Sequence, residues 1–419
     1  MGRARIAIIG AGPIGLEAAL LAVESGFDCN IYERGRVAEN VLCWGHVRLF
    51  SPFGLNASGR GRTALADSPF GEELPHDDDF LTGHEFTRRY LVPLSRLPRL
   101  TNRIHEQTEV AAVGRSRTGK RELIGMPLRA ADPFQLLIRD ARGERRIDAD
   151  YVFDCSGTYP HHNWCGAGGI PCVGEMEAAA EIEYGLPDLL GLNRDRYVGR
   201  TTLVVGDGYS AATAIISLAR LAEIDQRTKV VWLTRRPALA PIHRIDGDSL
   251  LERDKIAAKA NDLALAVGGP VDWRPATLIR EIRRDADGSR FRIACEQTAA
   301  RASAGREGEG GAQQTRELIV DRVIANVGYR PDRSLYEELQ VHECYASQGP
   351  IKLAAQILGA SSTDCLAQPS HGADALVNPE PHFYILGSKS YGRDSRFLLK
   401  AGLTQVDDVF SLIGREEKL

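Results

Sequence analysis

A glycine-rich turn near the start of the chain constrains its fold more than any other sequence feature. Residues 5–9 (RIAII) have the pattern of a buried strand, and Gly10, Gly12 and Gly15 follow it directly. A helical pattern comes next, and a second strand ends in Glu33. The first glycine permits the tight turn, the second lets backbone approach a pyrophosphate, and the third lets the helix pack against the strand. We therefore predict a dinucleotide-binding βαβ unit in which the helix N-terminus faces the phosphates and Glu33 faces a ribose.

A second unit of the same kind occupies residues 201–236. The residues of its turn that we expect to face a ligand are Gly206, Gly208, Tyr209, Ser210 and Ala211. The strand after its helix ends not in an acid but in Arg235 and Arg236. A carboxylate would repel a 2′-phosphate, whereas guanidinium groups bind one through charge-assisted hydrogen bonds. This ending favours NADPH over NADH.

Two similar apolar strands flank the second unit. Asp150–Pro160 and Asp321–Pro331 each run from an acid through a buried strand to a glycine, and then into a turn that contains proline. Such strands are typical of points where a chain passes between domains. We therefore predict an α/β fold with two Rossmann-like three-layer dinucleotide-binding domains, the second inserted into the first. The predicted boundaries are 1–157 and 329–419 for the first domain and 158–328 for the second.

The composition excludes several classes of partner. The chain has 419 residues with 52 Lys and Arg against 56 Asp and Glu, so no basic field supports binding to nucleic acid or to an anionic membrane. Glu17 interrupts the apolar run near the N-terminus, and no later apolar stretch reaches the roughly 18 residues of a membrane span. We expect a cytoplasmic protein without a secretory signal.

Eight cysteines are spread over the chain without a Cys-x-x-Cys pair. Cys165 and Cys172 are the closest two, and no second pair of Cys or His ligands accompanies them. We therefore predict neither zinc nor any other metal, and we expect the thiols to be reduced.

Together these features resemble one large group of enzymes. The chain is similar to the FAD- and NAD(P)H-dependent oxidoreductases with two dinucleotide-binding domains, and most of all to their monooxygenase-like branch. The group includes the flavin-containing monooxygenases and the pyridine nucleotide–disulfide reductases. In these enzymes the first glycine turn holds FAD, the second holds NAD(P)H, and a last strand, glycine and helix, here Phe383–Gly402, close over the flavin. The resemblance implies FAD and NADPH as cofactors. The implied cofactor-binding residues are Gly10, Gly12, Pro13, Ile14, Gly15, Glu33, Arg34, Trp44, Gly157, Gly206, Gly208, Tyr209, Ser210, Ala211, Arg235, Arg236, Gly328 and Gly387.

The chain departs from this group in ways that bear on its reaction. Ser388 stands where many members have an aspartate that binds the ribityl chain. Only 91 residues follow Gly328, so we expect no separate dimerisation domain of the kind that carries the catalytic histidine of glutathione-reductase-like enzymes. The signature FxGxxxHxxx(Y/F) of N-hydroxylating monooxygenases is not found.

The segment from Cys43 to Pro52, which is part of a longer candidate segment 43–56, resembles the Trp-bearing segment of monooxygenase-like flavoproteins. We therefore expect that NADPH reduces bound FAD and that the reduced flavin reacts with dioxygen. A flavin hydroperoxide would then oxygenate a small-molecule substrate. This reaction needs a dry pocket rather than a protein nucleophile, and Trp44, His46, Arg48 and Phe50 are the candidate wall of that pocket.

Two other functions fit the same cofactors. Cys43 lies where disulfide reductases of this group carry a redox thiol, and Arg48 and His46 would lower its pKa, so a single-cysteine disulfide reductase is the first alternative. The second alternative is a non-catalytic redox sensor that binds flavin without turnover. Cys43 and His46 are thus the candidate catalytic residues, and the sequence leaves the oligomeric state open.

Overall fold

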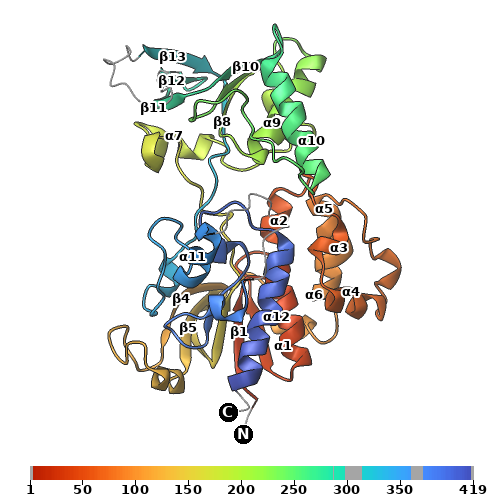
Figure 1. The fold of residues 1–419 in the computed structure, drawn as a ribbon, viewed down its shortest axis with the longest axis vertical. Helices are drawn as coiled ribbons and strands as arrows, with labels where there is room; N and C mark the ends of the chain where they lie inside the picture. Colours follow the sequence, from red (N-terminus) through yellow and green to blue (C-terminus); the bar gives the residue numbers. More distant parts are fainter. Residues whose placement is uncertain (1–2, 286, 298–313, 360–370, 417–419) are drawn as a thin grey trace. The chain divides into compact units, whose positions relative to one another are not determined.

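We describe the protein from a computed structural model that covers residues 3–285, 287–297, 314–359 and 371–416. Contacts within the chain divide it into two compact units. Unit 1 contains residues 1–161 together with 329–419, and unit 2 contains residues 162–328. Each unit is built on a parallel sheet with helices against it, which confirms the predicted α/β fold class (Figure 1).

The central sheet of unit 1 has five parallel strands in the order β15-β7-β1-β2-β3. The strands are β1 (Arg5–Ile9), β2 (Asp28–Tyr32), β3 (Ile104–His105), β7 (Tyr151–Asp154) and β15 (Phe383–Ile385). Strand β1 is central because it is apolar on both faces, and parallel strands in such a position are covered on both sides. The glycine turn that follows β1 therefore lies at the carboxyl edge of the sheet, where ligands bind in folds of this kind.

Two different layers cover the two faces of this sheet. Ile6 and Ile8 of β1 pack against α1 (Pro13–Glu24) and α12 (Leu399–Glu416), which lie side by side (Figure 1). Ala7 and Ile9 face the opposite side and pack against an antiparallel sheet. Its strands are β4 (Glu109–Arg115), β5 (Phe134–Asp140) and β6 (Gly143–Ala149). The alternation of side chains along a strand thus gives unit 1 its three layers.

Short helices surround this core in unit 1. They are α2 (Glu39–Cys43), α3 (Phe53–Asn56), α4 (Gly59–Ala66), α5 (Gly83–Phe86), α6 (Val92–Ser95) and α11 (Ile351–Gly359). Helix α5 begins with a capping box, because the Thr82 hydroxyl accepts from the Glu85 amide and the Glu85 carboxylate accepts from the Thr82 amide.

Unit 2 repeats the three-layer plan. Its parallel sheet has the order β10-β9-β8-β14, from Val271–Arg274, Lys229–Leu233, Thr201–Val205 and Arg322–Ala325. Val204 and Trp232 pack in one cluster with α9 (Tyr209–Ile224) and α10 (Leu251–Leu265). Leu203 and Leu233 face the other side, toward an antiparallel sheet. Its strands are β11 (Thr277–Arg284), β12 (Phe291–Gln297) and β13 (Gln314–Val320), and two short helices, α7 (Glu175–Ala178) and α8 (Arg194–Tyr197), complete the unit.

Candidate cofactor-binding sites

The first glycine turn has the geometry that its spacing predicts. Gly10 adopts a left-handed φ of 100°, and a Cβ there would lie 2.8 Å from the Cys155 carbonyl oxygen. A Cβ on Gly15 would lie 1.9 Å from the Gly10 carbonyl oxygen, so only glycine lets α1 pack this close to the turn. A Cβ on Gly12, in contrast, would meet no atom within 4 Å. The turn is therefore closely packed at Gly10 and Gly15 and open at Gly12.

Helix α1 presents its N-terminus at this open glycine. Gly12 is the N-cap, Pro13 takes the first helical position, and no side chain caps the helix. Its first backbone N–H groups and the positive end of its dipole are thus available to an anion. Ile14 is buried instead, because Gly387 and Gly402 both pack against its side chain.

Glu33 ties the end of β2 to the turn. Its two carboxylate oxygens accept hydrogen bonds from the Ala11 amide at 2.8 Å and from the Gly35 amide at 2.7 Å. A carboxylate offers about four lone-pair sites, so these two bonds leave acceptor capacity for ligand hydroxyls. Arg34, also predicted to bind cofactor, is exposed beside it.

Three segments that are far apart in the sequence meet at Gly157, at the end of β7. Gly157 and Gly387 both have left-handed φ, at 73° and 71°. A Cβ on Gly157 would lie 3.5 Å from Ser388 Oγ and 4.0 Å from Asn40 Nδ2. Within the described residues these two polar side chains have no protein hydrogen-bond partner. The missing Cβ therefore leaves a cradle with a hydroxyl and an amide beside it.

A buried ion pair supports this edge of the sheet. Lys389 Nζ donates to Asp154 Oδ2 at 2.6 Å and to Ser156 Oγ at 3.0 Å, and the lysine and aspartate side chains are 1% and 0% exposed. The Lys389 ammonium also lies 5.1 Å from the centroid of the Tyr336 ring. Sequence reasoning missed Asn40, Asp154 and Lys389. A charged residue at the end of the apolar strand YVFD was the only signal for this pair.

The segment that carries Cys43 and Trp44 does not form an activated thiol. Cys43 is exposed at the end of α2, and partial burial together with the Glu39 carboxylate raises the pKa of its thiol. The expectation that Arg48 and His46 lower this pKa is therefore wrong, because neither contributes to it. The half-buried Trp44 ring packs against Gly83, where a Cβ would lie 2.9 Å from it.

The second glycine turn repeats the pattern of the first within unit 2. Gly206 has a φ of 129°, and a Cβ there would lie 2.2 Å from the Asn326 carbonyl oxygen. A Cβ on Gly208 would meet nothing within 4 Å, and Gly208 is the uncapped N-cap of α9. Ala211, which stands in place of the third glycine, is fully buried.

The other predicted residues of unit 2 lie at the ends of its strands and helix. Tyr209 and Ser210 form the first turn of α9. Gly328 has a left-handed φ of 82°, and a Cβ there would lie 3.4 Å from Asn163 Nδ2. Arg235 and Arg236 follow β9 and are exposed. Neither guanidinium has an ion-pair partner in the part of the chain that the structure describes.

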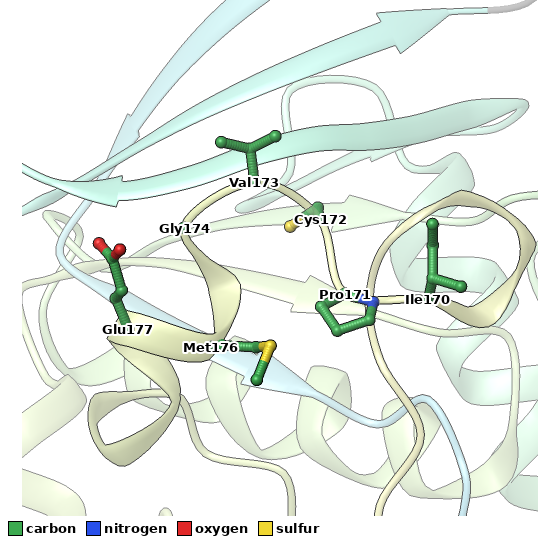
Figure 2. Close-up of a pocket in the computed structure, with 7 residues that line it drawn as sticks. All are labelled: Ile170, Pro171, Cys172, Val173, Gly174, Met176 and Glu177. Atoms are coloured by element: carbon green, nitrogen blue, oxygen red, sulfur yellow. The ribbon is translucent and has the colours of Figure 1, made fainter.

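An apolar pocket of about 390 Å³ lies elsewhere in unit 2. It is lined by the segment 170–174 together with Met176 and Glu177 (Figure 2). Of its lining residues, Ile170 and Met176 are 68% and 69% exposed, whereas Cys172 is buried. Nothing in the sequence predicted this pocket.

The residues that the structure describes contain neither a metal-binding cluster nor a membrane-spanning helix. No group of His, Cys, Asp and Glu side chains among them is arranged to hold a metal ion. None of their helices has both the length and the apolar character that crossing a membrane requires.

Two parallel-sheet units, each with a glycine turn that opens onto an uncapped helix, define a two-domain dinucleotide-dependent oxidoreductase. Residues 4–352 match the pyridine nucleotide-disulphide oxidoreductase family, and the chain belongs to this family. Family membership confirms the predicted cofactors, FAD and NADPH, and makes the chain a flavin-dependent oxidoreductase. No curated protein matches the sequence.

Solved structures share this fold at low sequence identity. The bacillithiol disulfide reductase of Bacillus cereus is 17% identical with a TM-score of 0.67, over 99% of this chain and 100% of that one. The ornithine N-hydroxylase of Kutzneria sp. 744 is 15% identical with a TM-score of 0.63, over 99% and 100%. The cadaverine monooxygenase of Erwinia amylovora is 13% identical with a TM-score of 0.65, over 97% and 94%. At these identities the likeness concerns the fold alone.

Proposed function

We propose that unit 1 binds FAD, that unit 2 binds NADPH, and that the enzyme uses the electrons of NADPH to oxygenate a small molecule. The observation that carries the cofactor assignment is the pair of open glycines, Gly12 and Gly208. Each caps a helix that no side chain caps, and each leaves space where a Cβ would otherwise stand. Backbone N–H groups at such helix ends bind phosphate.

The residues of unit 1 offer contacts to three parts of FAD: the pyrophosphate, a ribose and the ribityl chain. The turn at Gly12 would receive the pyrophosphate, and Glu33 would accept hydrogen bonds from the ribose hydroxyls with its remaining lone pairs. Ser388 and Asn40, which flank the bare face of Gly157, would hold the ribityl hydroxyls in place of the aspartate that many relatives use. Lys389 is not available for this contact because Asp154 and Ser156 already bind its ammonium group.

In unit 2 the charges favour the phosphorylated nucleotide. Arg235 and Arg236 are exposed, and no carboxylate among the described residues neutralises them. A 2′-phosphate would give both guanidiniums a partner through charge-assisted hydrogen bonds. When bound, the two cofactors would supply the transfer of a hydride equivalent from NADPH to FAD and of two electrons to an acceptor, and the protein would supply position and electrostatics.

The state of Cys43 supports dioxygen rather than a disulfide as the acceptor. A thiol reduces a disulfide as the thiolate, and the surroundings of Cys43 raise its pKa and so disfavour that form. Oxygenation needs no protein nucleophile. The segment 43–50 is held in place by backbone hydrogen bonds, because Val47 accepts from Gly83 and Leu49 donates to Leu81.

The test is anaerobic reduction of the purified holoenzyme with NADPH, followed by addition of either air or oxidised glutathione as the electron acceptor. We expect NADPH to bleach the flavin, admission of air to restore it with peroxide release in the absence of substrate, and oxidised glutathione to have no effect. The Cys43→Ser variant should keep the full rate in air. A disulfide-dependent rate that Cys43→Ser abolishes would establish the disulfide reductase instead. If NADPH does not bleach the flavin, the non-catalytic redox sensor is the remaining function.

A further inference from the structure

We propose that Arg330 and Arg393 of unit 1 bind an anionic group, a carboxylate or a phosphate, on the small molecule that the enzyme oxygenates. The substrate class named in this way rests on the proposed function. Three features of unit 1 support it: two guanidiniums without a carboxylate partner, a turn that joins the stretches of chain that carry them, and their position beside the cradle at Gly157.

Neither arginine has a carboxylate partner among the residues that the structure describes. The half-buried side chain of Arg330 makes no hydrogen bond or ion pair with any of them. The exposed side chain of Arg393 donates from Nε to the neutral Oε1 of Gln348 at 2.8 Å. Arg333 differs, because its Nη1 lies 3.2 Å from Oε2 of Glu343. Arg330 and Arg393 therefore keep their capacity to bind an anion.

The carboxylates that lie nearest to the two arginines in the sequence are engaged with other groups. Asp332 lies 3.4 Å from His161 Nε2 and accepts from the Ser334 hydroxyl at 2.6 Å. Asp394 forms an ion pair with Arg396, with Oδ2 2.7 Å from Nη2. Neither carboxylate forms an ion pair with the proposed binding arginine near it.

A turn from Glu343 to Ser347 joins the two stretches of chain that carry these arginines. The backbone N–H of Arg393 donates to the Ser347 carbonyl at 2.7 Å. At the other end of the turn, Glu343 pairs with Arg333, which lies three residues after Arg330. The fold of unit 1 therefore holds the two stretches on either side of one short turn.

The arginines act on one another through their charges. Burial, followed by the charges of Arg330 and Arg333, lowers the pKa of the Arg393 guanidinium. Of these three cations, Arg333 alone has a carboxylate partner among the described residues. Like charges that lie near one another repel, so a bound anion would offset an excess of positive charge in this part of unit 1.

The two arginines lie on segments that continue from the proposed ribityl cradle. The backbone N–H of Arg330 donates at 2.8 Å to the carbonyl of His161, which lies four residues after Gly157. Arg393 lies five residues after Ser388, the hydroxyl side chain of that cradle. Five residues span at most about 18 Å even when fully extended. Both arginines therefore belong to the carboxyl edge of the sheet in unit 1, where we place the flavin.

Two guanidiniums at this edge suit an oxyanion. Each presents N–H groups in a planar fork that binds a carboxylate or a phosphate through two parallel hydrogen bonds. Such contacts would hold the substrate beside the flavin in one orientation, which an oxygenation without a protein nucleophile requires. The same charges would repel an amine, so we expect an acid or a phosphate ester rather than a cationic substrate.

The test measures the binding of probe molecules to the oxidised, FAD-loaded holoenzyme by titration calorimetry at constant ionic strength. The anionic probes are benzoate and inorganic phosphate, and benzamide and benzylamine are the neutral and cationic counterparts of benzoate. We expect at least one of the two anions to bind. Benzamide and benzylamine should not bind under the same conditions, because only an anion complements the two guanidiniums.

Four variants make the assignment specific. Arg330→Gln and Arg393→Gln should each weaken the binding of the anion by about 10- to 100-fold, as expected for the loss of a hydrogen bond between charged groups. Arg96→Gln, at an exposed arginine of the same unit, is the matched control and should bind the anion as the wild type does. The double variant Arg235→Ala with Arg236→Ala removes the proposed phosphate-binding arginines of unit 2. It should leave the binding of benzoate unchanged.

The proposal is overturned if neither anion binds, if benzamide binds as well as benzoate, or if both Arg330→Gln and Arg393→Gln bind the anion like the wild type. It is also overturned if NADP⁺ displaces the anion and the two variants raise the KM for NADPH, because the arginines would then bind the nucleotide. Reduction of the wild-type flavin by NADPH is measured separately. If NADPH does not reduce the flavin, the proposed function fails, whereas the titrations still report whether the anion site exists.

Discussion

At the scale of single residues, charge placement separates binding groups from structural ones. Arg235 and Arg236 stand exposed without a carboxylate partner among the described residues, whereas Lys389 is saturated by Asp154 and Ser156. Exposed cations without partners keep their capacity to bind an anion, and a buried cation that is already paired does not. Arg235 and Arg236 are therefore available to bind the proposed nucleotide phosphate.

This distinction predicts a selective loss of NADPH affinity. The double variant Arg235→Ala with Arg236→Ala should raise the KM for NADPH by about 10- to 100-fold, since a hydrogen bond to a charged group contributes about 1.5–3 kcal/mol. The KM for NADH should change little, because NADH has no 2′-phosphate. Arg220→Ala, at an exposed arginine of α9, is the control. Equal effects on both nucleotides would contradict the assignment, and initial rates of flavin reduction measure it.

Glu17 makes a second prediction at this scale. It is buried in α1 at 1% exposure and accepts hydrogen bonds from the Ser58 and Tyr90 hydroxyls. Burial is the largest influence on its pKa and raises it above the ordinary 4.5. The folded state therefore binds this proton more tightly than the unfolded state. Its contribution to stability is complete below pH 4.5 and is lost as the pH rises through the folded pKa.

The variant Glu17→Gln should remove this loss. Its free energy of unfolding, measured in urea, should increase relative to that of the wild type as the pH rises from 4.5 towards 7. The increase should be about 1.4 kcal/mol for each unit by which the fold raises the pKa of Glu17. Glu72→Gln, at an exposed carboxylate of the same unit, should show no such trend. A constant difference between Glu17→Gln and wild type across this range would show that Glu17 is not responsible.

At the scale of elements, Gly12 and Gly15 have different roles at the junction of β1 and α1. Gly15 is required for helix and turn to pack, because a Cβ would lie 1.9 Å from a carbonyl oxygen. Gly12 has ordinary backbone dihedrals, with a φ of −79°, and open space at its Cβ position. Any need for glycine at residue 12 therefore comes from a ligand rather than from the fold.

Two alanine variants should separate folding from binding at this junction. Gly12→Ala should leave the melting temperature of the apoprotein unchanged and lower the affinity for FAD by about 10- to 100-fold, or about 1.4–2.8 kcal/mol. Gly15→Ala should lower the stability of the apoprotein itself by at least about 1–3 kcal/mol, as overpacking does. Calorimetry of the apoprotein and flavin fluorescence on titration measure the two quantities. Undiminished FAD binding by Gly12→Ala would place the pyrophosphate elsewhere.

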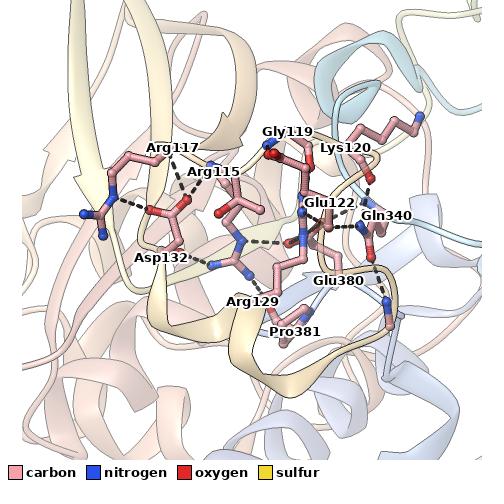
Figure 3. Close-up of polar contacts among 12 residues, drawn as sticks. Arg115, Arg117, Gly119, Lys120, Glu122, Arg129, Asp132, Gln340, Glu380 and Pro381 are labelled. Atoms are coloured by element: carbon pink, nitrogen blue, oxygen red, sulfur yellow. Dashed lines mark hydrogen bonds and ion pairs between the residues drawn. The ribbon is translucent and has the colours of Figure 1, made fainter.

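At the scale of the whole molecule, buried charges join the two sequence segments that make up unit 1. Glu380 accepts from Arg115 Nε at 2.7 Å and from Arg129 Nε at 2.9 Å, and all three side chains are fully buried (Figure 3). The backbone N–H of Gln340 also donates to the Glu380 carboxylate, at 2.8 Å. Arg115 and Arg129 come from the part of the chain before unit 2, and Gln340 and Glu380 come from the part after it. The triad thus holds the returning chain against strand β4 and the residues that follow it.

Removing the shared carboxylate should be costly. Glu380→Gln leaves two buried guanidiniums without a counter-charge, and we expect it to lower the free energy of unfolding by about 3–5 kcal/mol. Glu144→Gln, in an exposed pair with Arg139 at 2.7 Å, should cost no more than about 1 kcal/mol. Urea unfolding followed by a probe in unit 1 makes the comparison. Similar losses for the two variants would mean that the triad adds nothing beyond a surface pair.

The sequence by itself determined the two glycine turns, their βαβ context and hence the fold class and the cofactors. These features are local: a glycine at residue 10, 12 or 15 acts on the strand and helix next to it, so its spacing can be read directly. Interactions between distant segments could not be read in this way. Only the tertiary structure showed that Asn40 and Ser388 meet at Gly157 and that Lys389 binds Asp154.

The same reason applies to the cysteines. The disulfide-reductase alternative required Arg48 and His46 to lower the pKa of Cys43, yet burial and Glu39 raise this pKa. The sequence contained no motif for Cys165 and Cys172, which the fold brings together on Glu175. The reactivity of a thiol depends on burial and on charges contributed by other parts of the chain, and only the folded protein fixes both.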